Sequence, residues 1–198
     1  MKNPYFFGYG SLVNRATHEY PDAAPAKVQG WRRQWRHTGL RSVAFLTVVA
    51  DHGSMIEGLI AGVPNADWAA LDKREWAYQR LNANDHIRHD LNHDPEVALY
   101  AVPNDPDLEV SVKHPILLSY IDVVVQGYLI EFGHDGARRF FETTDGWDLP
   151  IINDRAEPMY PRHQLLSRSE RQFVDEQLSA LPAKIEQGED SGLTLNRF

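Results

Sequence analysis

Near its N-terminus the chain reads Phe7-Gly8-Tyr9-Gly10-Ser11-Leu12, directly after the aromatic pair Tyr5-Phe6. Aromatic residues that end at a glycine pair predict a short strand running into a tight loop. Glycines at a strand end leave backbone N–H groups that can face an anion or a carboxylate. On local grounds these residues also suit a plain glycine turn. A role in ligand binding therefore depends on which other residues lie beside the loop.

The rest of the first half is expected to be mainly strands. Residues 43–50 and 55–63 read as strands, and the composition of residues 51–54 predicts a hairpin turn between them. From residue 116 to 132 the apolar residues have helical spacing, and Ser167 and Glu170 have capping-box spacing. Strands followed by helices indicate an α+β fold with a mostly antiparallel or mixed sheet. Further strands are expected at residues 26–37, 78–89 and 97–102, and a short helix at residues 135–143.

One helix is predicted among the strands, from its cap at Asn65 to about Trp76. If the helical pattern continues to Tyr78, the residues Trp68, Leu71, Glu75 and Tyr78 share one face. Glu75 interrupts an otherwise apolar stripe, where a carboxylate is costly unless it is paired. Burial would raise its pKa, which suits a general base near neutral pH. The alternative is an ion pair with a neighbouring arginine such as Arg74 or Arg80.

Composition excludes several classes of function. The 198 residues carry a net charge of −8, so the chain lacks the basic surface of a nucleic-acid-binding protein. Its one basic and aromatic stretch, residues 31–36, reads as an edge or surface strand with Trp31, Arg33 and Trp35 on one face. There is no cysteine and no apolar run of membrane-spanning length. We expect a cytoplasmic protein that binds neither nucleic acid nor membranes.

A metal site is conceivable at a histidine cluster, where His86, His89 and His93 alternate with aspartates. This region reads as a strand followed by a loop, so the three imidazoles need not converge. A solvated polar segment is the alternative interpretation, and we expect no metal.

The glycine loop and the distant Glu75 together resemble a known family. Residues 7–12 near the N-terminus, the Gly30-Trp31 step, and Leu71-Asp-Lys-Arg-Glu75-x-x-Tyr78 are similar to the γ-glutamylcyclotransferase-like superfamily. That superfamily comprises γ-glutamylcyclotransferases, γ-glutamylamine cyclotransferases and ChaC-like enzymes. The match covers about residues 5–102, and the remainder is similar to a bacterial subgroup with a longer helical tail.

The resemblance implies a small mixed β-barrel with flanking helices and a cavity at its mouth. We expect one domain over residues 1–198, with the barrel in about 1–115, one inserted helix, and extra helices in about 116–185. It also implies release of 5-oxoproline from a γ-glutamyl amide, when the α-amine attacks the γ-carbonyl of the same molecule. No cofactor is required, and the partner is a small γ-glutamyl substrate.

The resemblance assigns the residues as well. Glu75 would be the general acid/base, and the loop residues Tyr9, Gly10, Ser11 and Leu12 would bind the substrate and stabilise the oxyanion. Tyr120 is a candidate to complete the site, with core packing as its alternative. Arg41 is a candidate to bind a substrate carboxylate.

Some alternatives remain open on sequence alone. Glycine-rich features that ChaC-like enzymes carry near Glu75 are missing, which argues against specificity for glutathione. The sequence does not indicate the leaving group (amino acid, amine or glutathione). The aromatic and proline-rich stretch 143–162 is expected either to shape leaving-group specificity or to join two helices. A catalytically inactive binding protein of the same fold is the second interpretation, and exposed strand edges allow a homodimer.

Overall fold

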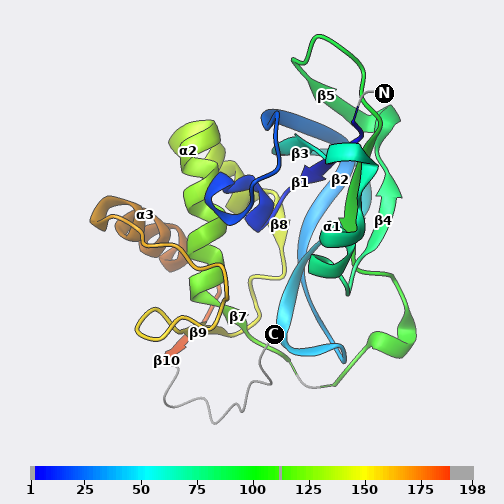
Figure 1. The fold of residues 1–198 in the computed structure, drawn as a ribbon. Coiled ribbons are helices and arrows are strands. Elements are labelled where there is room, and N and C mark those ends of the chain that lie inside the picture. Colours follow the sequence, from blue (N-terminus) through cyan, green and yellow to red (C-terminus); the bar gives the residue numbers. More distant parts are fainter. Residues whose placement is uncertain (1–2, 112, 188–198) are drawn as a thin grey trace.

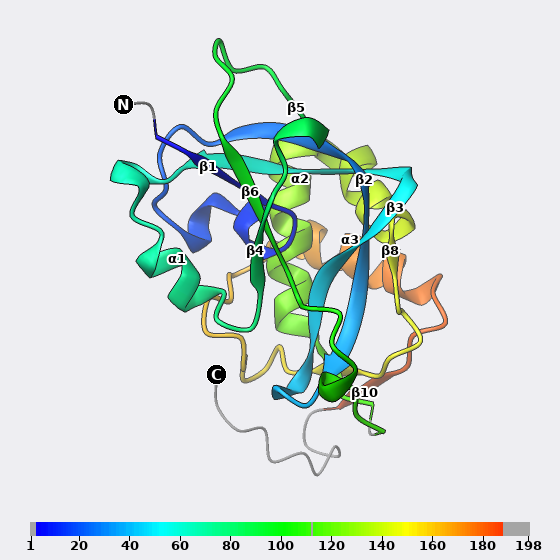
Figure 2. The same cartoon turned by 90° about the vertical axis from the view of Figure 1, so that its right-hand side faces the viewer.

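The computed structural model describes residues 3–111 and 113–187 (Figure 1). Within these residues, seven strands form one sheet, and three short strands form a second. The large sheet curls into half a barrel (Figure 2), which confirms the predicted α+β class. Its order is β4 (Gln79–Asn82), β6 (Val97–Ala101), β1 (Tyr5–Gly8), β3 (Arg41–Gly62), β2 (Ala24–Thr38) and β5 (Ile87–His89), with β8 (Thr144–Asp145) beside β2.

The pairing within this sheet is mixed. Strand β1 lies at the centre, antiparallel to β3 and parallel to β6. Its four residues are all buried, because both neighbours and both faces are covered. The predicted strand before the glycine loop is therefore confirmed, and the loop begins at Gly8, where this central strand ends.

The hairpin predicted at residues 51–54 is wrong. Strand β3 runs without interruption from Arg41 to Gly62, and it pairs with β2 on both sides of that stretch. Residues 51–54 form a bulge opposite Gly30, whose φ of +82° suits glycine. Ser54 and the Gly53 amide both bond the Asp51 carboxylate, so turn chemistry is present without a chain reversal. The true hairpin turn lies between Thr38 and Arg41.

The inserted helix is shorter than predicted. Asn65 and Ala66 have positive φ values, and the α-helix α1 spans only Ala69–Arg74. Asp67 accepts a hydrogen bond from the Ala69 amide at the start of the helix, which replaces the predicted Asn65 cap. Glu75 follows the last helical residue and is not itself helical. Short 3-10 turns complete this half of the chain: η1 (Ser11–Val13), η2 (Arg15–Thr17), η3 (Pro64–Ala66), η4 (Asn84–His86) and η5 (Pro106–Leu108).

The second half is built around one long helix. Helix α2 (Leu118–Glu142) lies between the large sheet and α3 (Arg168–Ser179), as Figure 1 shows. Gly133 interrupts α2 with a positive φ and non-helical backbone, so α2 consists of two helical segments that meet where the sequence predicts one helix to end and the next to begin. The Ser167–Glu170 capping box is confirmed. The small parallel sheet was not predicted, because strands of two or three residues carry no periodicity: β7 (Ile116–Leu117), β9 (Ile151–Asn153) and β10 (Ile185–Gln187).

The core lies between the sheet and α2, and it contains an unexpected cation. The expectation that residues 31–36 form an edge or surface strand is wrong, because β2 lies inside the sheet and Arg33 is only 1% exposed. Its guanidinium packs on the rings of Tyr128 and Phe140. Among the described residues, no helix is long and apolar enough to cross a bilayer.

Candidate active site

A cleft at the end of β1 brings together residues that are far apart in the sequence. The glycine loop forms one wall, Glu75 and Tyr78 form a second, and Tyr120 of α2 forms a third. Of the predicted substrate-binding residues, the four loop residues and Tyr120 therefore lie in the same cleft as the predicted acid/base. The lining residues are Phe7, Gly8, Tyr9, Gly10, Ser11, Leu12, Leu46, Glu75, Tyr78, Tyr100 and Tyr120.

The loop has to be glycine-rich because other atoms approach its backbone closely. A Cβ at Gly10 would lie 2.6 Å from the Tyr120 hydroxyl, well inside van der Waals contact. The loop then enters η1, where the Val13 amide donates to the Gly10 carbonyl. Because the first N–H groups of a helical turn have no partner within the turn, the amides before Val13 are available to the cleft. Burial raises the pKa of Tyr120, and the backbone of Ser11 acts against that rise.

This approach predicts a non-additive mutation pair. Gly10→Ala should destabilise the protein by about 1–3 kcal/mol, because the new methyl group overlaps the Tyr120 hydroxyl. The next atom, Leu46 Cδ2, is at 3.5 Å, so Tyr120→Phe should remove most of that cost in the double variant. Chemical denaturation of the two single variants and the double variant measures the coupling. Additive costs would contradict the close packing of Gly10 on Tyr120.

Glu75 is a largely buried carboxylate on the wall of the cleft. Its side chain is 16% exposed and lies 3.2 Å from the Arg74 guanidinium. Burial raises the pKa of Glu75, while the charges of Arg74, Arg162 and Arg41 act against that rise. The sequence left burial and an ion pair as alternatives for Glu75. In the structure the carboxylate is both desolvated and paired with Arg74. A carboxylate whose pKa is raised can accept a proton from an ammonium group and later return it.

The residues of the predicted stripe do not all lie on one helix, because α1 ends at Arg74. Leu71 is fully buried, and Trp68 and Tyr78 pack against the same cluster. Tyr78 is reached through a turn, in which its amide donates to the Glu75 carbonyl. The Tyr78 hydroxyl donates to the Leu46 carbonyl across the cleft. Arg80, the other proposed partner of Glu75, pairs with Asp72 instead.

Helix α2 holds the loop from behind. The Tyr128 hydroxyl donates to the Tyr9 carbonyl at 3.0 Å and is itself bonded by Arg33 at 2.9 Å. Arg33 also donates to hydroxyls of Thr143 and Thr144 and to the Glu57 carbonyl. These positioning contacts were missed at the sequence level. The alternation that put Arg33 on a face with two tryptophans was the available signal.

Two tyrosines from the second half contact the glycine loop or line the cleft beside it. The Tyr160 hydroxyl donates to Ser11 Oγ at 2.8 Å, and its ring packs edge-on against Tyr120 with centroids 4.9 Å apart. The cleft that remains holds about 30 Å³, space for roughly two water molecules at about 10–15 Å³ each. A larger ligand therefore has to displace one of these side chains. Tyr160 belongs to the stretch 143–162, which was singled out in the sequence without a site assignment.

The other predictions have mixed outcomes. Arg41 lies in a neighbouring small cavity on the far side of Tyr120, and not in the cleft itself. The start of the stretch 143–162 packs in the core through Trp147, and only its end reaches the cleft. The three histidines stay apart, in η4, β5 and the following loop. Across residues 3–111 and 113–187, no group of three histidine, aspartate or glutamate side chains is placed to hold a metal.

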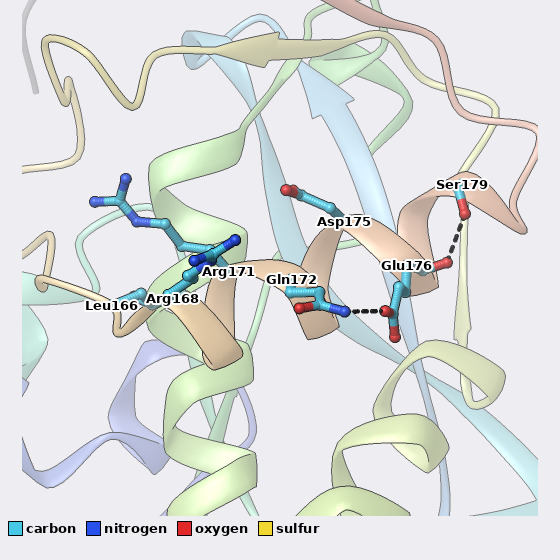
Figure 3. Close-up of a pocket in the computed structure, with 7 residues that line it drawn as sticks. All are labelled: Leu166, Arg168, Arg171, Gln172, Asp175, Glu176 and Ser179. Carbon is cyan, nitrogen blue, oxygen red and sulfur yellow. Dashed lines mark hydrogen bonds between the residues drawn. The ribbon is translucent and has the colours of Figure 1, made fainter.

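A second depression lies on α3, away from the cleft (Figure 3). Its side chains come almost entirely from one face of that helix. Gln172 bonds Glu176, and Ser179 bonds the Glu176 carbonyl, as the dashed lines show. Asp175 pairs with Arg155, which does not belong to this face. This surface is a solvated helix face, and the cleft beside Glu75 remains the candidate active site.

Comparison with known proteins agrees with the geometry. Residues 6–118 match a family model described as "Gamma-glutamyl cyclotransferase, AIG2-like". No curated protein matches the sequence.

Solved structures share the fold at low identity. A structure named "Gamma-glutamyl cyclotransferase" is 14% identical with a TM-score of 0.56, over 88% of this chain and 99% of the other. YkqA from Bacillus subtilis is 18% identical with a TM-score of 0.55, over 74% of this chain and 57% of the other. An uncharacterized Homo sapiens protein is 14% identical with a TM-score of 0.53, over 88% and 99%. This likeness confirms the fold that the sequence resemblance implied.

Proposed function

Since the chain belongs to the gamma-glutamyl cyclotransferase, AIG2-like family, we propose that it releases 5-oxoproline from a γ-glutamyl amide, with Glu75 as general acid/base. The observation that carries this proposal is a largely buried carboxylate facing a glycine loop across a small cleft. Burial of a carboxylate lowers the free energy of unfolding, and a role in catalysis would explain why the chain keeps one here.

The reaction accounts for each group in the cleft. The α-ammonium of the glutamyl group loses a proton to Glu75, and its nitrogen then attacks the γ-carbonyl carbon. A new C–N bond closes the five-membered ring, and the bond from that carbon to the leaving nitrogen breaks. Glu75 returns the proton to the leaving nitrogen. The ring nitrogen gives up its second proton, which the released amine takes up, so that 5-oxoproline and an ammonium form. Because attack is intramolecular, orientation in the cleft supplies much of the rate.

The loop would stabilise the charge that develops on the carbonyl oxygen. Its amides precede the first backbone bond of η1, and a polar oxygen, the Tyr120 hydroxyl, already packs against the loop at Gly10. A substrate carbonyl oxygen would take the place of that hydroxyl. Backbone donors held in this way act strongly, because the site excludes water.

The alternative is a binding protein of the same fold without catalysis. The two are separated by incubating the purified protein with γ-glutamyl dipeptides, γ-glutamylamines and glutathione and measuring 5-oxoproline. Product from any of them supports the enzyme. Binding without product supports the alternative.

Activity should depend on pH through Glu75. Burial raises its pKa above the ordinary value of 4.5, so the carboxylate stays protonated at pH values where an exposed glutamate is already ionised. We expect kcat/KM to rise with pH through that raised pKa, because only the ionised form accepts the proton. A pH–rate profile of 5-oxoproline release measures this acid limb. A limb at or below pH 4.5 would contradict the assignment of the base.

A further inference from the structure

Arg74 joins two walls of the cleft. It is the last residue of α1, directly before Glu75, and its side chain is only 9% exposed. Its Nε lies 3.2 Å from Glu75 Oε1. Its Nη2 donates to Ser11 Oγ, also at 3.2 Å. One rigid guanidinium therefore contacts both the proposed acid/base and the glycine loop.

A third contact fixes this guanidinium in place. Nη1 donates to the Thr17 carbonyl at 2.9 Å, and Nη2 lies 3.3 Å from Thr17 Oγ1. Thr17 is buried in η2, and its hydroxyl donates to the Ser11 carbonyl at 2.9 Å. Each of the three nitrogens of Arg74 thus has a protein partner. A lysine has one ammonium on a flexible stem and could not fill all three positions.

The contact with Ser11 limits where the serine hydroxyl hydrogen can point. Ser11 Oγ accepts from Arg74 and also from the Tyr160 hydroxyl, the latter at 2.8 Å. A serine hydroxyl has two acceptor lone pairs and one hydrogen, so both lone pairs are engaged. Among the described residues the hydrogen has no acceptor, and Ser11 lines the cleft. Arg74 therefore helps to keep this hydrogen available to an oxygen atom of the substrate.

Arg74 also acts on the ionisation of Glu75. Burial raises the pKa of Glu75, and Arg74 opposes that rise most strongly, followed by Arg162 and Arg41. A cation this close favours the ionised carboxylate. The other groups that face Glu75 are phenols whose pKa is raised by burial, so that they are uncharged near neutral pH: Tyr9, Tyr20, Tyr78 and Tyr120.

We propose that Arg74 is a positioning residue that holds the Glu75 carboxylate and the Ser11 hydroxyl in one fixed arrangement across the cleft. This inference rests on the proposed function, in which Glu75 moves protons and the loop binds the carbonyl oxygen. Arg74 is not among the residues that line the cleft, so it acts through its neighbours. Its charge keeps Glu75 ionised to lower pH, and its planar shape keeps the two groups in place.

Two substitutions separate the charge of Arg74 from its shape. Arg74→Gln removes the charge, so the acid limb of kcat/KM for 5-oxoproline release should move to higher pH by about 1–3 pH units, the effect of one close opposite charge on a carboxylate. Arg74→Lys keeps the charge without the planar group. Its acid limb should stay near that of the wild-type chain, while kcat above the limb falls by about 10–100-fold. A residue that only stabilised the fold would not separate the limb from the plateau.

Ser11→Ala examines the loop side of this arrangement. It should lower kcat and leave the acid limb in place, because it removes no charge. Combined with Arg74→Lys, the two losses in kcat should not add, since both variants remove the same contact. Unfolding temperatures of all variants identify any that fail to fold. Additive losses in folded variants would contradict a shared arrangement.

Arg80→Gln is the matched control, because Arg80 pairs with Asp72 and does not line the cleft. It should change neither the acid limb nor the plateau. An unchanged acid limb in Arg74→Gln would overturn the inference. Equal losses in Arg74→Gln and Arg74→Lys without a shift of the limb would also overturn it, because Arg74 would then serve the fold alone.

The ionisation of Glu75 is also measurable without turnover. Carbon-13 NMR of the glutamate carboxyl carbons, with Glu75 assigned by comparison with Glu75→Gln, follows its titration directly. Glu75 should titrate about 1–3 pH units higher in Arg74→Gln than in the wild-type chain. If the wild-type chain forms no 5-oxoproline from any γ-glutamyl substrate, the proposed function is refuted. Equal titration of Glu75 in the two proteins would instead refute the role of Arg74.

Discussion

Glu75→Gln should reduce 5-oxoproline release by about 10²–10⁴-fold, the range that a positioned general acid/base contributes. Glutamine keeps the size of the side chain and one acceptor oxygen toward Arg74, but it cannot accept the ammonium proton. The loss should fall on kcat as well as on kcat/KM, because proton transfer belongs to the chemical step. Steady-state kinetics at neutral pH, with 5-oxoproline as the measured product, checks this.

The same variant should remain folded. Because the pKa of Glu75 is raised in the folded state, the folded protein holds its proton more tightly than the unfolded chain does. The free energy of unfolding therefore decreases as pH rises from about 4.5 through the raised pKa, and that cost persists at neutral pH. Glutamine removes this cost, so Glu75→Gln should unfold at the same or a higher temperature than the wild-type chain at pH 7. Wild-type activity in Glu75→Gln would exclude Glu75 as the base.

A matched substitution is available as a control. Glu142 is exposed at the end of α2, and it is not among the residues that line the cleft. Glu142→Gln makes the same chemical change, and it should leave both the rate and the unfolding temperature unchanged. A comparable loss in this variant would mean that net charge, and not the position of Glu75, determines the rate.

Gly58→Ala should strongly destabilise the fold. A Cβ at this position of β3 would lie 2.5 Å from Phe7 Cζ and closer still to the Gly8 carbonyl oxygen. Neither neighbour can move freely, because Phe7 is 1% exposed and Gly8 is paired within the sheet. We expect a loss of about 3 kcal/mol, at the upper end for overpacking. For a chain of this size that lowers the unfolding temperature by roughly 6–12 °C.

The same strand offers the control for this prediction. Gly53 lies exposed in the bulge of β3, and a Cβ there would meet only Asp51 Oδ1, at an ordinary 3.6 Å. Gly53→Ala should therefore change the unfolding temperature by little. Differential scanning calorimetry of both variants measures the difference. Equal effects would show that the close packing of β1 on β3 does not limit stability.

The sequence predicted those parts of the fold that local chemistry controls. Strand β1 ends at Gly8 as the aromatic run and the glycine pair require, and the α3 capping box forms as its spacing indicates. The bulge at residues 51–54 could not be distinguished from a hairpin, because both use the same turn residues. The choice between them depends on pairing with β2, which is a tertiary interaction.

The candidate site likewise contains residues that could be predicted from the sequence and residues that could not. The loop and Glu75 could be predicted, since each breaks a local pattern, a strand in one case and an apolar stripe in the other. Tyr160 and Tyr128 could not, because their roles arise from contacts across the fold and their residue type is ordinary in their own segments. For Arg33 the only signal was its place on one strand face with two tryptophans. Arg41 was predicted as a carboxylate ligand, and the structure locates it in a cavity separate from the one lined by Glu75.

The way α2 and the stretch after it hold the loop has a consequence for how the protein folds. The contacts that fix the loop join residues 109 positions apart (Asn14 to Val123), 119 apart (Tyr128 to Tyr9) and 149 apart (Tyr160 to Ser11). Contacts of such high sequence separation form slowly, because each closes a long loop of chain. The hairpin of β2 and β3 needs no such closure. We therefore expect the β2–β3 hairpin to form early and the candidate site to be completed last, when the C-terminal half docks.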